Sequence, residues 1–219
     1  MLSNLLRAKL VKPFQNKIIF MTLSGDRLMI ILSSPSGVGK TTITKKLQQK
    51  YQNLKISISH TTRSPRSNEI DGIDYNFITK KKFEELINKR KFYEYAKIFE
   101  NYYGTLKQKV DELSKDYDIL FDIDWQGTKQ LSKFKNLKLI KIFLITNSKD
   151  ELKKRLLKRD QNTKNEVEKR FNSFDEDVKH WKDYDYILIN KNLESCFKQV
   201  EQILFNHKEK HFNFFQTVQ

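Results

Sequence analysis

The sequence feature that most constrains the fold is a short apolar run, residues 28–32 (LMIIL), followed directly by the loop SSPSGVGK. After the loop, Ile43, Leu47 and Tyr51 recur every four residues, which is the spacing of one face of a helix. The order strand, glycine loop, helix is the context in which a loop of this kind binds phosphates. This part of the sequence therefore predicts a nucleotide-binding unit of the α/β class.

The remaining chain repeats the alternation of short apolar runs with longer amphipathic ones. Further strands are predicted at 55–59, 117–123, 138–145 and 184–189, and helices at about 105–115, 125–134, 148–159, 164–181 and 192–208. Strands that alternate with helices predict a parallel sheet with helices on both faces.

Residues 60–104 depart from this alternation. They contain Asp71-Gly72 and two aromatic, strand-like pieces, 74–78 and 92–99, around a short predicted helix at 80–89. We expect a small inserted subdomain of mixed structure that binds a substrate. A second irregular stretch, KRDQNTKNE, lies between two basic helices and predicts a lid over about residues 148–172.

Composition sets limits on function. The 219 residues carry a formal net charge of +15, which favours anionic partners, but the sequence has no motif that reads nucleic acid. The single cysteine, Cys196, suits a reducing compartment, and the four histidines lack ligand spacing for a protein-built metal site. No apolar run approaches the roughly 20 residues that cross a bilayer. We therefore expect a cytoplasmic protein with no membrane partner, whose oligomeric state the sequence leaves open.

The first residues differ from the rest of the chain. Residues 1–25 contain four basic side chains and no acidic one. Three readings stay open: a disordered basic extension over residues 1–27, an organelle-targeting segment, or translation that begins at Met21.

In a phosphate loop, backbone N–H groups face the phosphates, a lysine bridges the β- and γ-phosphates and a hydroxyl holds Mg²⁺. Gly37, Gly39, Lys40 and Thr41 occupy the corresponding positions, while Ser34 replaces the first glycine. A small residue suffices there if its backbone torsions are ordinary. The predicted ATP-binding loop is Ser34, Pro35, Ser36, Gly37, Val38, Gly39, Lys40, Thr41 and Thr42.

Two further groups of polar residues predict ligand contacts. Asp122 and Asp124 end an apolar strand two residues apart, so the period of two should send both side chains to one side of the sheet, unless they merely start a turn. One carboxylate would bind Mg²⁺, directly or through water, and the other a substrate. Arg63 and Arg66 flank Ser64-Pro65, and guanidinium pairs of this kind form forked contacts with phosphate. With hydroxyls from Ser59 and Tyr75, they predict a second anion site.

Four motifs in order, SPSGVGKTT, SHTTRSPRSNEIDGIDYNF, ENYYGT and DIDWQG, resemble the guanylate kinase family from about residue 28 to 208. The resemblance implies a guanylate kinase-like domain over 28–210, with the GMP-binding subdomain at 60–104. In this family the residue at the position of Ser34 is often a small one and not strictly glycine.

The resemblance also assigns roles to individual residues. It implies that GMP phosphate is held by Ser59, Arg63, Arg66, Tyr75 and Tyr103, that Glu69 orients the arginines, and that guanine is read by Glu94, Thr105 and Asp124. Asp122 belongs to the same GMP site and, with Thr41, is a candidate magnesium ligand. The catalytic cations would be Lys40, Arg63, Arg155, Arg159 and Arg170, and Asn190 matches an adenine-contacting position. Lys191-Asn192 stand where the family often has an acidic pair, so the adenine contacts here differ in detail.

The implied reaction is Mg²⁺-dependent phosphoryl transfer from ATP to GMP, and to dGMP. The chemistry of Glu94 agrees, because guanine presents N1–H and an N2 amine side by side and adenine does not; such sites discriminate by roughly 10⁴-fold. Two alternatives remain: another nucleoside monophosphate kinase, and a non-catalytic domain that binds phosphorylated partners. The intact phosphate loop disfavours the non-catalytic domain. The base preference of the enzyme would distinguish a guanylate kinase from another nucleoside monophosphate kinase.

Overall fold

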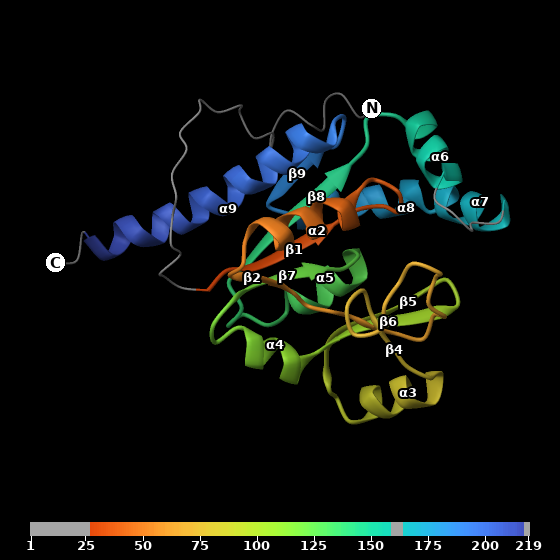
Figure 1. Cartoon of the computed structure of the whole chain (residues 1–219), viewed down its shortest axis with the longest axis horizontal. Coiled ribbons are helices and arrows are strands. Elements are labelled where there is room, and N and C mark those ends of the chain that lie inside the picture. Colours follow the sequence, from red (N-terminus) through yellow and green to blue (C-terminus); the bar gives the residue numbers. More distant parts are fainter. Residues whose placement is uncertain (1–26, 159–163, 217–219) are drawn as a thin grey trace.

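The structure, a computed structural model, describes residues 27–158 and 164–216 (Figure 1). Its larger sheet has five strands in the order β2-β7-β1-β8-β9, and every neighbouring pair is parallel. The strands are β1 (Met29–Ser33), β2 (Leu54–Ile56), β7 (Asp118–Asp122), β8 (Leu139–Ile145) and β9 (Tyr186–Ile189). The predicted α/β class with a parallel sheet is therefore confirmed.

Helices cover both faces of this sheet because its strands are apolar on both sides. Ile30 and Leu32 of β1 belong to one buried cluster, packed against α2 (Lys40–Lys50) and α9 (Leu193–Gln216). Ile31, which points the opposite way, belongs to a second cluster with α4 (Lys107–Leu113) and α5 (Trp125–Leu131). Near-continuous apolar strands of this kind are typical of parallel sheets buried on both faces.

A smaller mixed sheet lies below the large one in Figure 1, together with α3 (Lys80–Asn88). Its strands are β3 (His60–Thr61), β4 (Asn76–Phe77), β5 (Phe92–Ile98) and β6 (Asn101–Leu106), in the order β4-β3-β6-β5. The ring of Phe83 in α3 is fully buried and stacks on Phe92 at 4.5 Å and on Tyr102 at 5.2 Å between centroids. The segment therefore has an aromatic core of its own.

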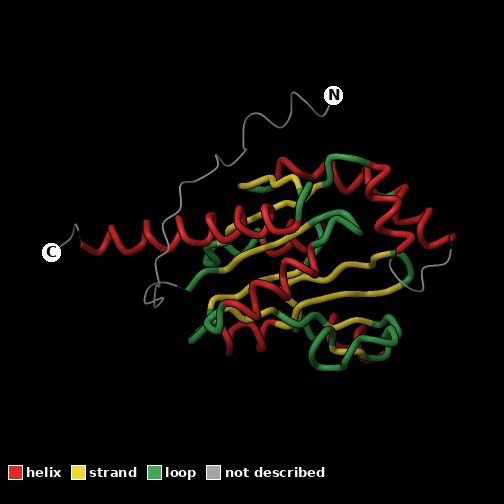
Figure 2. Tube along the Cα trace, turned by 45° about the horizontal axis from the view of Figure 1, so that its top comes forward, coloured by secondary structure: helices red, strands yellow, loops and turns green. Residues whose placement is uncertain are grey.

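Three short helices follow β8 at the far side of the molecule: α6 (Lys149–Lys158), α7 (Lys164–Asn172) and α8 (Phe174–Lys179). Figures 1 and 2 show α6 and α7 as an arm at the end of the molecule opposite the C-terminus. Leu152 and Leu156 of α6 are buried in the same cluster as α2 and β1, so the base of the arm belongs to the core.

Several predicted boundaries were wrong, each for an identifiable reason. The strand predicted at 55–59 pairs with β7 only from Leu54 to Ile56. The helix predicted from 105 begins at Lys107, because residues 101–106 pair with β5 as a strand that the sequence reading missed. The helix predicted over 164–181 is divided into α7, α8 and a 3₁₀ turn, η1 (His180–Asp183), and α9 continues past residue 208 to Gln216.

Two features lie away from the site. Lys208 and Asp118 form a buried ion pair at 2.8 Å, which ties α9 to the start of β7. No helix in the described part of the chain is long and apolar enough to cross a membrane. The expected basic extension, apart from Arg27, lies outside the described residues.

Candidate active site

The phosphate loop joins the end of β1 to the start of α2 and depends on two glycines with positive φ. Gly37 has φ +84° and Gly39 has φ +108°, a region that side-chain-bearing residues rarely adopt. A Cβ at Gly37 would lie 2.8 Å from a methyl carbon of Leu156, and one at Gly39 would lie 2.7 Å from Nδ2 of Asn190. Ser34 is not among the described non-glycine residues with positive φ, so its torsions meet the condition that serine requires.

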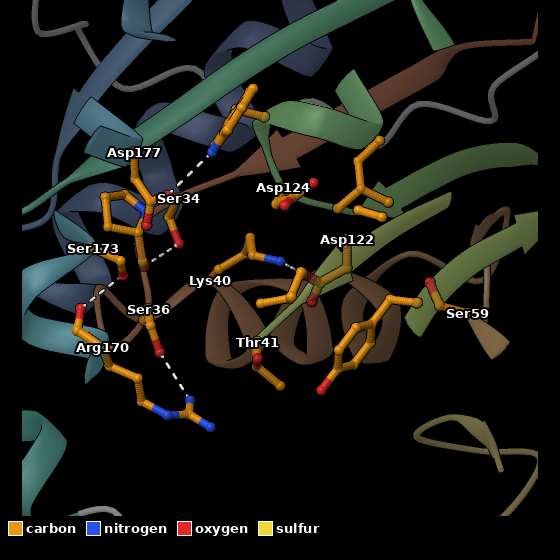
Figure 3. Close-up of a pocket in the computed structure, with 18 of the residues that line it drawn as sticks. Ser34, Ser36, Lys40, Thr41, Ser59, Asp122, Asp124, Arg170, Ser173 and Asp177 are labelled. Atoms are coloured by element: carbon orange, nitrogen blue, oxygen red, sulfur yellow. Dashed lines mark hydrogen bonds and ion pairs between the residues drawn. The ribbon is translucent and has the colours of Figure 1, made fainter. Parts of the chain in front are cut away.

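A cavity of about 890 Å³ opens beside this loop, between the large sheet, the small sheet and the helical arm. Most predicted site residues line it: Ser34, Pro35, Ser36, Gly37, Gly39, Lys40, Thr41, Thr42, Ser59, Arg63, Arg66, Tyr75, Glu94, Tyr103, Asp122, Asp124, Arg155 and Arg170. Figure 3 shows Lys40 directed at Asp122, with which it forms an ion pair, and Thr41 beside them. The volume is within the range of small-molecule sites.

On the small-sheet side of the cavity, Glu69 holds two arginines. Both of its carboxylate oxygens accept from Arg63 Nη2 at 2.8 Å, and they also accept from the backbone N–H and the Nη1 of Arg66, at 2.8 and 3.1 Å. Partial burial by itself raises the pKa of Glu69, but the bonds from Arg66 and Arg63 outweigh it and hold that pKa below its usual value. Arg63 also lies over the ring of Tyr75, 5.4 Å from its centroid. The two guanidinium groups are thus fixed before any anion arrives.

Glu94 is the most deeply buried acid of the cavity, at 3% exposure, and it lies opposite the buried Thr105 on the neighbouring strand. Among the described atoms its Oε1 has no hydrogen-bond partner. Burial raises the pKa of Glu94 to about 7, and the nearby charge of Asp124 acts in the same direction. A buried carboxylate with an unpaired oxygen, facing a cavity, is suited to a ligand that brings its own donors.

Asp124 and Gly127 lie next to Glu94 at the start of α5 (Trp125–Leu131). β7 ends at Asp122, so the predicted continuation of strand geometry to Asp124 was wrong; instead Asp124 caps α5 and accepts from the Gly127 N–H at 2.9 Å. It still lines the cavity. A Cβ on Gly127 would lie 2.4 Å from Glu94 Oε2, so a larger residue there would displace the Glu94 carboxylate. Sequence reading quoted Gly127 in a motif but gave it no role.

The helical arm brings two cations to the phosphate loop. Arg170 Nη1 donates to Ser36 Oγ at 3.0 Å, which Figure 3 shows, and Arg155 Nη1 donates to the Val38 carbonyl at 3.3 Å. Arg155 also pairs with Glu151 of its own helix, at 3.0 Å. The third predicted cation of the arm, Arg159, lies outside the described residues.

Four predicted residues do not line the cavity. Val38 is fully buried beneath the loop, and the amide of Asn190 donates to the Val38 carbonyl at 2.7 Å, so Asn190 supports the loop from behind. Its predicted contact with adenine is not visible in this arrangement and stays a prediction. Glu69 and Thr105 lie one layer behind the cavity wall, next to the side chains they contact.

The cavity residues that the sequence did not lead us to assign include Trp125, Asp177 and Lys45. The Trp125 indole stacks on His180 at 3.6 Å between ring centroids and donates to Asp177 Oδ1 at 3.2 Å. Nothing in the spacing of α8 singled out Asp177, because it looks like one of three adjacent acids on a solvated helix.

The donor set fits one divalent cation only together with a phosphate ligand. In the described part of the chain, no group of three or more histidine, cysteine or acidic side chains is arranged to hold a metal. Thr41 and Asp122 do present a hydroxyl and a carboxylate to the cavity, and Mg²⁺ is commonly held by one or two such oxygens plus substrate phosphates.

Comparisons with known proteins agree with one another. The profile described as "Guanylate kinase" matches residues 26–207. A guanylate kinase of Paramagnetospirillum magneticum is 43% identical over 184 residues, covering 84% of this chain and 86% of that protein. One of Rickettsia felis is 42% identical and is covered in full by 88% of this chain. The crystal structure of guanylate kinase from Anaplasma phagocytophilum superposes with a TM-score of 0.70 at 28% identity, covering 85% of this chain and 89% of the other. The chain belongs to the guanylate kinase family.

Proposed function

We propose that the cavity transfers the γ-phosphoryl group of ATP to GMP, giving ADP and GDP. The observation that carries this function is the pairing of two different anion sites in one cavity: a phosphate loop on the large sheet and an acid-clamped arginine pair on the small one. A single phosphate site would serve hydrolysis, whereas two sites facing each other serve transfer. The family membership supports the same conclusion.

We assign the acceptor phosphate to Arg63 and Arg66, with hydroxyls from Ser59, Tyr75 and Tyr103. All three hydroxyl residues and both arginines line the cavity, and the two tyrosine rings lie 5.9 Å apart between centroids. Planar guanidinium groups that are already held in position bind phosphate with little loss of side-chain entropy.

Guanine would be read by Glu94 and Asp124. An ionised Glu94 accepts from N1–H and from one N2 proton, and Asp124 accepts from the other, while Thr105 lies beside Glu94. Adenine has an acceptor at N1 and no N2 amine, so it would leave the buried Glu94 unpaired.

The transfer step needs positioning and positive charge rather than a covalent intermediate. An oxygen of the GMP phosphate attacks the γ-phosphorus, the bond to the β–γ bridging oxygen breaks, and ADP leaves. Lys40, Arg155 and Arg170 surround the phosphate loop and would neutralise charge on the moving group, and we assign Arg159 to the same set. Mg²⁺, held by Thr41 and Asp122 with the nucleotide phosphates, would supply further electrostatic stabilisation.

We further propose that residues 28–210 form one domain, within which residues 60–104 are the acceptor subdomain and residues of about 148–172 are a lid. The contacts of Arg155 and Arg170 with the phosphate loop support a lid that excludes water when substrates are present. The single buried cysteine suits a reducing compartment, so we place the reaction in the cytoplasm.

A nucleotide panel tests the function directly. With Mg²⁺ and ATP, ADP release should be rapid with GMP, measurable with dGMP, and far slower with AMP, CMP, UMP and dTMP. Glu94→Gln should lower kcat/KM for GMP by roughly 10²-fold and leave the KM for ATP almost unchanged, because a hydrogen-bonded charge is lost from one substrate only.

Glu84→Gln is the matched control, because Glu84 is an exposed acid of the same subdomain, on α3. It should behave as the wild type. Absence of GMP phosphorylation by the wild-type protein would refute the function, and equal losses for GMP and ATP in Glu94→Gln would refute base reading.

A further inference from the structure

Asp177 is an acidic side chain in a cavity whose other charged side chains are mostly positive. Lys40, Lys45, Arg63, Arg155 and Arg170 line the same space. A carboxylate repels phosphate, so Asp177 does not belong to either anion site. Its partner in the substrates must be a neutral group that donates a hydrogen bond.

The side chain is held in position from one side only. Its Oδ1 accepts from the Trp125 indole at 3.2 Å, and that indole is itself fixed by stacking on His180. In the described residues no donor takes Oδ2. Asp177 therefore keeps one acceptor oxygen available in the cavity, on a side chain whose direction is already fixed.

The neighbours of Asp177 indicate which nucleotide it faces. Trp125 directly follows Asp124, the acid assigned to the N2 edge of guanine. Burial, and secondly the nearby charge of Asp124, raise the pKa of Asp177 to about 7, so the two acids lie close together. The guanine donors are already matched by Glu94 and Asp124. The remaining donors of a GMP bound there are the two ribose hydroxyls, which lie next to the N2 edge because the sugar is attached at N9.

We infer that Asp177 is a specificity-determining residue that accepts a hydrogen bond from a ribose hydroxyl of the acceptor nucleotide. This rests on the proposed function, since it presumes GMP with its base at Glu94 and Asp124. Oδ2 is assigned to one of the two hydroxyls, and the test below shows which one. The raised pKa agrees, because an arriving hydroxyl donor would favour the ionised form.

The test compares acceptors that differ by one oxygen. Wild-type enzyme is assayed with GMP, 2′-deoxy-GMP and 3′-deoxy-GMP at fixed ATP. We expect one deoxy analogue to have a kcat/KM about 10-fold below that of GMP, mainly through KM, which is the size of a hydrogen bond to a charged group. Asp177→Asn should lower kcat/KM for GMP by about the same factor and leave that analogue unchanged, so that the preference disappears.

Asp175→Asn is the matched control. Asp175 lies two residues away on α8, pairs with Lys149 and has a side chain that is 68% exposed. It should keep the wild-type preference. Circular dichroism and melting of each variant check the fold.

Three results would overturn the inference: no preference among the three acceptors in the wild type, an equal loss for all three in Asp177→Asn, or a changed ratio for ATP against its deoxy analogues instead. The last would assign Asp177 to the donor sugar. Each leaves the proposed function standing as long as the wild type converts GMP to GDP. If it does not convert GMP, the function itself fails first.

Discussion

The two groups of arginines around the cavity are held in different ways. Arg63 and Arg66 share one carboxylate, Glu69, through four hydrogen bonds of 2.8 to 3.1 Å within a single loop. Arg155 and Arg170 reach across from the helical arm to neutral acceptors of the phosphate loop, a carbonyl at 3.3 Å and a hydroxyl at 3.0 Å. The bonds of the first group join opposite charges, whereas those of the second group run from a charged donor to a neutral acceptor and lack the attraction between two ions.

This difference suggests a division of work. Clamped arginines present a fixed surface to an incoming phosphate and should contribute to substrate binding. The bonds of Arg155 and Arg170 to the phosphate loop go to neutral acceptors and can be exchanged at small cost for a charged phosphoryl group, so these arginines should contribute most when charge moves. Arg155 also has its ion pair with Glu151 on the same helix. The first group is therefore expected to set KM for GMP and the second to set kcat.

The largest effect is expected at Lys40, which belongs to neither group. Lys40→Ala removes the ammonium group that we propose to lie beside the transferred phosphoryl group, and we expect kcat to fall by about 10³-fold with the fold retained. Lys50→Ala, on the last turn of the same helix, is the control and should keep full activity. Activity near wild type in Lys40→Ala would mean that the loop is not the triphosphate site.

A smaller loss is expected when one arginine is removed from the second group, Arg155 and Arg170. Arg170→Ala should lower kcat by about 10²-fold, since Arg155 remains, and leave the KM for GMP nearly constant. Lys169→Ala on the same helix should have little effect. A rise in the KM for GMP without a loss of kcat would erase the proposed distinction between the two groups.

The clamped group is tested through Glu69 rather than through the arginines themselves. Glu69→Gln keeps the shape but removes the charge that fixes both guanidinium groups, so the KM for GMP should rise about 10-fold while kcat changes little. Steady-state kinetics with GMP varied at saturating ATP measures both constants. A fall in kcat alone would show that the clamp serves the chemical step instead.

Much of this arrangement could be predicted from the sequence. The alternation of apolar and amphipathic segments gave the parallel sheet, because buried strands and helix faces have distinct periods. Boundaries failed where tertiary pairing decides them: residues 101–106 became a strand only because β5 lies alongside. A single sequence carries no direct signal for that contact.

The candidate site likewise contains features that local sequence predicts and features that depend on tertiary contacts. The glycines and lysine of the phosphate loop and the Arg63–Arg66 pair were recognisable because their chemistry is local, whereas the arginines of the helical arm were assigned from the family resemblance. Asp177, Trp125 and the fit of Gly127 against Glu94 join elements far apart in the chain, so only the folded structure reveals them. Asn190 was assigned from a motif position, yet the fold puts its amide behind the loop.

The smallest effect concerns stability and has the opposite sign to the effect on activity. The pKa of Glu94 is about 7 in the folded protein, against 4.5 for an ordinary glutamic acid. Below pH 4.5 the group is protonated in both states and costs nothing. As pH rises towards 7 the unfolded chain loses this proton and the folded chain keeps it, so the free energy of unfolding falls and stays lowered above pH 7.

Glu94→Gln should therefore raise the melting temperature of the ligand-free protein at pH 8 by a few degrees, yet not at pH 4.5, while Glu84→Gln should change the melting temperature at neither pH. A variant that melts lower at pH 8 would show that Glu94 stabilises the empty protein, and that its burial is not maintained at the expense of stability for the sake of guanine.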